Sequence, residues 1–173
     1  MRLLIVSDSH GNSHILDELV EKYIDHVDKF VHCGDSELPD NHLVWNIMDT
    51  VSGNCDFYAD FKDIHIERET AFPYAIVHGH HHNVKWTLED LKEFAKLNKL
   101  SFMFYGHSHI LKFDYEDGIF FINPGSIQSP RGLLREKTYC LLEANDTTVK
   151  IRVFDDQHEE LPELFQKWEL TQV

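Results

Sequence analysis

Five short apolar runs in this chain each end in a cluster containing Asp, His or Asn, and this repeated arrangement is the strongest constraint on its fold. The runs and their clusters read LLIV-SDSH, KFVHC-GD, TVS-GN, YAIV-HGH and FMFY-GHSH. Such runs are typical of strands buried on both faces of a sheet. In an open α/β sheet, the carboxyl ends of the strands meet at the edge where ligands bind. We therefore expect the five clusters to converge on one site.

Helical and strand-like patterns alternate through the first two thirds of the chain. Apolar residues at helical spacing predict a helix over 13–27, capped by Asn12 or Ser13. A second helix is predicted over 87–97, opened by Thr87 with a near capping box to Asp90. A short helix is expected around 41–48, and strands are expected at 3–6, 29–32, 49–52, 64–70, 74–78 and 101–105.

After residue 105 the helical patterns stop. Residues 112–125 predict a hairpin that turns at Asp117-Gly118, and residues 137–155 predict a second hairpin that turns near Asn145-Asp146. Residues 161–168 predict a last helical turn. No linker or repeat divides the chain, so we expect one domain over residues 1–173. The pattern indicates the α/β (α+β) class, with two mixed β-sheets packed together and flanked by helices.

Composition limits the classes of function. The formal net charge is −14 and no Lys/Arg cluster is present, so we expect no binding to duplex nucleic acid. No apolar run approaches the roughly 18 residues that span a bilayer, which predicts a cytoplasmic protein without membrane association. The three cysteines form no C-x-x-C pair, and we expect reduced thiols. Histidine is abundant, with 13 copies in 173 residues.

The polar clusters have the chemistry of a divalent-cation site. Carboxylate and amide oxygens combined with imidazole nitrogens suit Mn²⁺, Fe²⁺ or Zn²⁺. Seven such side chains exceed what one ion takes while leaving room for water, so two ions that share a carboxylate fit better. Metals about 3.5–4 Å apart can hold a bridging hydroxide and clamp the oxygens of a phosphoryl group. The candidate ligands are Asp8, His10, Asp35, Asn54, His78, His107 and His109.

In this order, D-x-H at 8–10, G-D at 34–35, G-N at 53–54, H-G-H at 78–80 and G-H-x-H at 106–109 resemble the calcineurin-like metallophosphoesterase superfamily. The short length, GNCD and NPGS make the chain similar to the small prokaryotic YfcE-type phosphodiesterases, which also resemble a eukaryotic retromer subunit. The resemblance implies a metallophosphatase-like four-layer sandwich. It also implies a dinuclear phosphodiesterase that uses a metal-bridging hydroxide.

The resemblance also assigns the ligands. It implies that one ion is held by Asp8, His10, Asp35 and His109. It implies that the other ion is held by Asp35, Asn54, His78 and His107, with Asp35 bridging. Mn²⁺ is the first choice of cofactor, and Ni²⁺, Zn²⁺, Fe²⁺ or Mg²⁺ are the alternatives.

The residue after G-N departs from the wider superfamily. Most members have a histidine there that protonates the leaving group, whereas this chain has Cys55, followed by Asp56. A thiol with a pKa near 8.5 is a poor acid, which favours diesters with good leaving groups and makes His80 a candidate proton donor. Arg131 is a candidate for binding a substrate phosphate in bidentate fashion. The catalytic candidates are Asp35, Asn54, Asp56 and His80, and the substrate-binding candidates are Asn54 and Arg131.

Two alternatives remain open at this point. One is a phosphomonoesterase or nucleotide pyrophosphatase with the same metal site, and the other is a non-catalytic metal-binding scaffold for protein interaction. For the enzyme we expect a small phosphodiester or nucleotide-like substrate, and a homo-oligomer is one option for the assembly. His32 is interpreted as a core histidine, and Cys33 and Cys55 as small buried hydrophobic residues.

Overall fold

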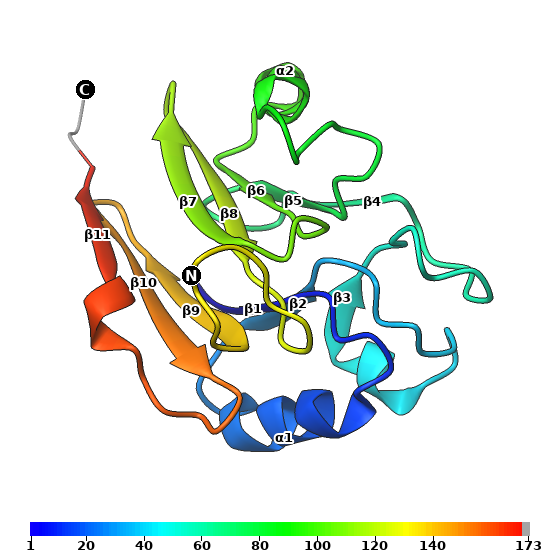
Figure 1. Cartoon of the computed structure of the whole chain (residues 1–173). Helices are drawn as coiled ribbons and strands as arrows, with labels where there is room; N and C mark the ends of the chain where they lie inside the picture. The colour runs from blue at the N-terminus through cyan, green and yellow to red at the C-terminus, as the bar shows by residue number, and fades with distance from the viewer. Residues whose placement is uncertain (171–173) are drawn as a thin grey trace.

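The computed structural model describes residues 1–170, within which two β-sheets pack face to face (Figure 1). The six-stranded sheet has the order β11-β10-β9-β1-β2-β3. Its strands are β1 (Arg2–Val6), β2 (Lys29–His32), β3 (Met48–Thr50), β9 (Thr138–Ala144), β10 (Thr148–Asp155) and β11 (Gln166–Glu169). The five-stranded sheet has the order β4-β5-β6-β8-β7. Its strands are β4 (Ile64–Glu67), β5 (Tyr74–Val77), β6 (Phe102–Phe104), β7 (Leu111–Glu116) and β8 (Ile119–Pro124).

Each sheet has one helix on its outer face, which gives four layers and confirms the predicted fold class. Helix α1 (Ser13–Tyr23) covers the six-stranded sheet, and α2 (Glu89–Asn98) covers the five-stranded sheet (Figure 1). Short 3₁₀ helices occupy Leu43–Asn46 and Pro162–Leu164. Neither helix in residues 1–170 has the length and apolar character needed to cross a bilayer.

Strand β1 shows why the apolar runs become central strands. Leu3 and Ile5 pack into the core between the sheets, whereas Leu4 and Val6 pack against α1. Because successive side chains of a strand point to opposite faces, the part of a strand that is covered on both faces, here residues 3–6, must be apolar at every position. Strands β1, β2 and β3 run parallel, as do β5, β6 and β8, so each sheet has a set of carboxyl ends at one edge.

The helix boundaries differ from the prediction. Helix α1 has the predicted cap, since the Asn12 side chain accepts a hydrogen bond from the Ile15 amide, but it ends at Tyr23 and not at residue 27. The predicted capping box of α2 is wrong. Helix α2 begins at Glu89 after Leu88, whose side chain makes no capping bond. The Thr87 hydroxyl accepts from the Glu89 amide, but the reciprocal bond is missing, because the Thr87 amide donates to the Asn83 carbonyl and the Asp90 carboxylate accepts from Asn83.

The predicted helical turn over 161–168 is wrong beyond Leu164. Residues Gln166–Glu169 instead form β11, which pairs antiparallel with β10. In this conformation Trp168 packs edge-on against Phe120 of the other sheet, with ring centroids 5.3 Å apart. Strand pairing satisfies the edge of β10 and places the indole against the core, neither of which a local helical turn would do.

Candidate metal centre

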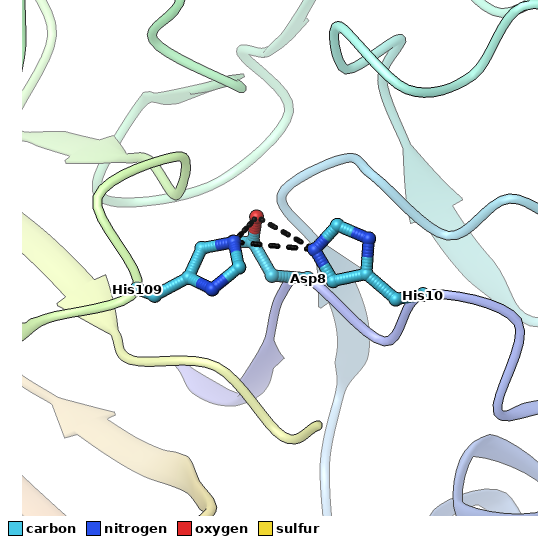
Figure 2. A group of neighbouring side chains, drawn as sticks. All are labelled: Asp8, His10 and His109. Carbon is cyan, nitrogen blue, oxygen red and sulfur yellow. Dashed lines mark hydrogen bonds and ion pairs between the residues drawn. The ribbon is translucent and has the colours of Figure 1, made fainter. Parts of the chain in front are cut away.

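The turn after β1 and the turn after β6 bring three predicted ligands together (Figure 2). Asp8 Oδ1 lies 3.1 Å from His109 Nε2 and 3.8 Å from His10 Nε2. The two histidine Nε2 atoms are 3.2 Å apart. One carboxylate oxygen and two imidazole nitrogens thus point at a common volume, and they come from segments about 100 residues apart in the sequence.

A second group of donors adjoins the first and shares Asp8. His78 Nε2 lies 3.2 Å from Asp35 Oδ2, 3.9 Å from Asp8 Oδ1 and 3.1 Å from Asn54 Oδ1. A carboxylate oxygen of Asp35 also lies within 4.8 Å of donor atoms of His10 and Cys55. Asp35 therefore touches donors on both sides of the centre, as expected of a bridging carboxylate.

His107 lies at the border of this centre. Its ring centroid is 5.1 Å from that of His78, and its backbone amide donates to Asp8 Oδ2 over 3.2 Å. Among residues 1–170, the sets of donor atoms within 4.8 Å of one another do not include its side chain. The assignment of His107 as a ligand stays a prediction.

The hydrogen bonds of three histidines show that the site fits divalent cations. The Nδ1 atom of His10 donates to Glu37, that of His78 to the Cys33 carbonyl, and that of His109 to the Ser129 carbonyl, all at 2.7–2.8 Å. Each neutral ring thus carries its proton on Nδ1 and a lone pair on Nε2. These lone pairs face carboxylate oxygens and one another, an arrangement that is repulsive unless a proton or a cation lies between them.

Charge and burial at the carboxylates agree with this arrangement. Burial of Asp8 favours its neutral form, but positive charge beside it, which protonated His109 and His78 rings supply when no cation is bound, holds the pKa of Asp8 below its usual value. Contact with His78 likewise outweighs burial and lowers the pKa of Asp35. Asp8 Oδ1 is buried and accepts no hydrogen bond within residues 1–170. The carboxylates therefore remain ionised and available to a metal ion.

The turns that carry the ligands have an unusual backbone. Five predicted ligands have a positive φ of 42–68°, which non-glycine residues rarely adopt, namely Asp8, His10, Asp35, His107 and His109. Such strain persists where the surroundings fix it, and it concentrates at functional sites. Gly106 permits the close approach of these turns, since a Cβ atom there would lie 2.5 Å from Asp8 Oδ2.

The other predicted site residues occupy distinct places. The His80 ring is half-buried, 5.4 Å from the His78 ring, and burial lowers its pKa. The Asp56 carboxylate lies beneath the site and accepts the backbone amides of Asp35, Glu37 and Gly53 at 2.7–2.8 Å. This contact positions two ligand turns relative to each other. The Arg131 side chain is exposed, and its amide donates to the His109 carbonyl.

The interpretation of Cys55 as a buried hydrophobic residue is wrong. Cys55 is partly exposed, and its Sγ atom lies within 4.8 Å of donor atoms of His10 and Asp35. Burial and the negative charge of Asp35 raise the pKa of the thiol to about 11. By contrast, Cys33 is buried, and His32 is a core histidine that contacts the Ser9 hydroxyl and accepts the Gly34 amide.

Sequence reasoning missed the residues that orient the ligands. Glu37 holds His10, the Ser7 hydroxyl donates to Asp8, and the Ser126 hydroxyl donates to the Asp8 carbonyl. The one feature of the sequence that pointed to Glu37 was that it is an acidic residue two positions after Asp35. Ser126 lies 118 residues from Asp8, and no local pattern connects them.

The sequence is similar to those of proteins named as probable metallophosphoesterases. Residues 1–147 match the family model of the calcineurin-like phosphoesterase superfamily domain. The probable metallophosphoesterase YsnB of Bacillus subtilis is 35% identical over 164 residues, covering 95% of this chain and 96% of YsnB.

Solved structures share the fold over nearly the whole chain. A predicted phosphoesterase from Streptococcus pneumoniae TIGR4 has a TM-score of 0.94 at 32% identity, with 98% of this chain and 97% of that chain covered. The phosphoesterase Yfce from E. coli has a TM-score of 0.67 at 20% identity, with 99% and 100% covered. Zinc-bound Vps29 from Entamoeba histolytica has a TM-score of 0.69 at 19% identity, with 98% of each chain covered.

The last two likenesses concern the fold alone, whereas the family model and YsnB extend to the sequence. The resemblance inferred from the five motifs is thereby confirmed. These matches, together with the convergent donors at the strand ends, show that the chain belongs to the calcineurin-like phosphoesterase superfamily, a family of metal-dependent hydrolases of phosphoesters.

Proposed function

We propose that this protein is a phosphodiesterase that holds two divalent cations, with Mn²⁺ as the first choice. The observation that carries the proposal is the set of three histidines whose Nδ1 atoms are engaged and whose Nε2 atoms face two carboxylates. In the proposed assignment, Asp8, His10 and His109 hold one cation, Asn54, His78 and His107 hold the other, and Asp35 bridges them.

When bound, two such cations activate water at neutral pH and compensate charge on phosphoryl oxygens. The protein's own part is to keep the ligands in the binding-competent protonation state. Contacts with His109 and His78 keep Asp8 and Asp35 ionised, as their lowered pKa values indicate. Contacts with Asp35 and Asp8 raise the pKa of His78 against the effect of burial, so a proton competes with the cation at this nitrogen.

The chemistry of the leaving-group side favours diesters. With a pKa of about 11, the Cys55 thiol retains its proton at neutral pH and is a weak acid. His80 is the proposed proton donor, although its lowered pKa makes the protonated form a minor one. A diester carries less negative charge than a monoester. A chain with a net charge of −14 therefore repels a diester less than it repels a monoester. Diesters with good leaving groups need the least proton donation.

Hydrolysis of a matched pair of esters tests the proposal. Metal-stripped protein receives Mn²⁺, Ni²⁺, Zn²⁺ or Mg²⁺ and is assayed on bis(p-nitrophenyl) phosphate and p-nitrophenyl phosphate. We expect metal-dependent cleavage with preference for the diester. Asp35→Asn removes the bridging carboxylate and should lower kcat/KM at least 100-fold, whereas Asp17→Asn, an exposed helical position, should retain it.

The alternatives predict different results in the same assay. A phosphomonoesterase would cleave the monoester faster than the diester. A scaffold, as the fold shared with the retromer subunit Vps29 permits, would bind metal and cleave neither ester. Equal activity of Asp35→Asn and the wild type would contradict the proposed metal centre.

A further inference from the structure

A pocket of about 410 Å³ adjoins the candidate metal centre. Its lining includes Glu37, Leu38, Pro39, Cys55, Phe57 and Tyr58. Two of these residues also belong to the centre, because Glu37 accepts from His10 and the Cys55 thiol lies within 4.8 Å of donor atoms of His10 and Asp35. A molecule with its phosphoryl group at the metal centre can therefore place one of its ester groups in this pocket.

The two sides of the pocket are fixed to each other. Asp56 lies between Cys55 and Phe57 in the chain, and its carboxylate accepts the backbone amides of Asp35 and Glu37 across the pocket. A third amide, that of Gly53, donates to the same carboxylate. This cradle of hydrogen bonds ties the loop after β3 to the turn after β2. The pocket is thus preformed rather than assembled on binding.

Two exposed aromatic side chains line the pocket. Phe57 is 78% exposed and Tyr58 is 99% exposed, although they are consecutive in the chain and adjoin the candidate site. An exposed pair of large apolar groups is the informative exception on a protein surface. Their ring faces are free to stack on a planar group, and Leu38 and Pro39 add an apolar floor.

The charge of the pocket restricts its occupant. Within residues 1–170, the lining contains the carboxylates of Glu37 and Asp56 and no lysine or arginine. A second phosphate or a carboxylate would be repelled there, while an uncharged ring would lose little on leaving water. We propose that the pocket is a subsite for an uncharged aromatic ester group, such as an aryl group or a nucleobase of a nucleoside phosphodiester. This inference rests on the proposed function and names the substrate class of the same site.

The test compares two phosphonates that differ in one group. Phenylphosphonate and methylphosphonate present the same anion to the metals, and neither has an ester bond to cleave. Their dissociation constants are measured by calorimetry on the manganese-loaded full chain. Because stacking of a ring on an aromatic side chain favours binding, the wild type should bind phenylphosphonate about tenfold more tightly than methylphosphonate.

Substitutions show which side chains produce the preference for phenylphosphonate over methylphosphonate. Phe57→Ala and Tyr58→Ala should each reduce the preference for phenylphosphonate at least threefold, and the double variant should reduce it to less than twofold. Phe57→Tyr and Tyr58→Phe keep the rings and should keep the preference. The control is Leu97→Ala, which removes an exposed apolar side chain from α2 and should change nothing. Affinity for methylphosphonate should stay constant throughout, because the metal ligands are intact.

Each outcome bears on one proposal separately. An undiminished preference in the double variant, or no preference in the wild type, overturns the aromatic subsite even if bis(p-nitrophenyl) phosphate is cleaved. A preference that disappears with the two rings supports the subsite even if no ester is cleaved, and the absence of cleavage then contradicts the proposed phosphodiesterase alone. If neither phosphonate binds, the proposed subsite is overturned.

Discussion

The three histidines of the candidate metal centre differ in what holds their rings. The backbone carbonyls of Cys33 and Ser129 accept from His78 and His109, whereas a side chain, Glu37, accepts from His10. Partners of this kind fix the orientation of a ligating imidazole and increase its basicity. Glu37 is therefore the point at which a substitution can change ligand orientation without removing a ligand.

We predict that Glu37→Gln weakens metal binding by about 10-fold, within the range of 10–100-fold that such orienting partners control. The amide oxygen can still accept from His10, but it lacks the negative charge that favours a cation nearby. Calorimetric titration with Mn²⁺ measures the change. The matched control is Glu18→Gln, which alters another Glu that pairs with a histidine, His14 at 2.9 Å, away from the centre. Equal affinities in both variants would show that Glu37 does not support the site.

At the residue scale, the sequence revealed the donors but not their partners. Asp8, His10, Asp35, His78 and His109 were identifiable because each follows an apolar run, and the structure brings them together. The Ser129 carbonyl could not be identified, because any backbone carbonyl can accept and only the fold determines which one does. The contacts of Asp56 were hidden for a similar reason, since its partners are amides of two separate turns.

The turns between elements set the geometry of the site. The turn that follows β6 passes close to the end of β1. A side chain at position 106 would collide with the side chains of Ser7 and Asp8, so only glycine fits there. Elsewhere the glycine requirement has another cause. At Gly118, in the hairpin between β7 and β8, the space is open and the backbone has a φ of +82°.

We predict that Gly106→Ala lowers the free energy of unfolding by about 2 kcal/mol, as overpacking of a dense interior does, and that it also weakens Mn²⁺ binding by displacing the Asp8 carboxylate. Gly118→Ala should cost about 1 kcal/mol for its left-handed backbone and leave Mn²⁺ affinity unchanged. Urea unfolding and metal titration of both variants provide the comparison. The close approach of the turns would be contradicted if Gly106→Ala bound metal as tightly as Gly118→Ala.

Elements that are determined by burial could be predicted, and elements that are determined by pairing could not. Strands β5 and β6 and the buried part of β1, residues 3–6, had to be apolar at every position because both of their faces are covered. Strand β11 has no such run, and its conformation depends on the edge of β10 and on the contact of Trp168 with Phe120. The same local sequence therefore permitted a helical turn until the partner strand was known.

At the scale of the whole molecule, the candidate metal centre lies where the two sheets meet. Asp8 and Asp35 follow strands of the six-stranded sheet, whereas His78 and His109 follow strands of the five-stranded sheet. Bound cations would thus connect the two sheets and reduce the repulsion of a chain with a net charge of −14. Cation binding should consequently stabilise the entire fold.

We predict that Mn²⁺ at about 100 times its dissociation constant adds about 2.7 kcal/mol to stability, which for a chain of this size raises Tm by about 5–10 °C. Thermal unfolding followed by circular dichroism, with Mn²⁺ or with EDTA, measures the difference. The shift should shrink in Asp35→Asn and persist in Asp17→Asn. Identical melting curves with Mn²⁺ and EDTA would argue against a cation that connects the sheets.

The register of β1 also has a consequence for the order of folding. Strand β1 is central, and its second neighbour is β9, with Leu3 opposite Leu142 and Ile5 opposite Cys140. A ribosome adds about 5–20 residues per second. The edge of β1 that pairs with β9 therefore stays unpaired for on the order of ten seconds during synthesis. Asp8 and His10 leave the ribosome early, but the sheet that supports them is completed only when nearly the whole chain has been synthesised.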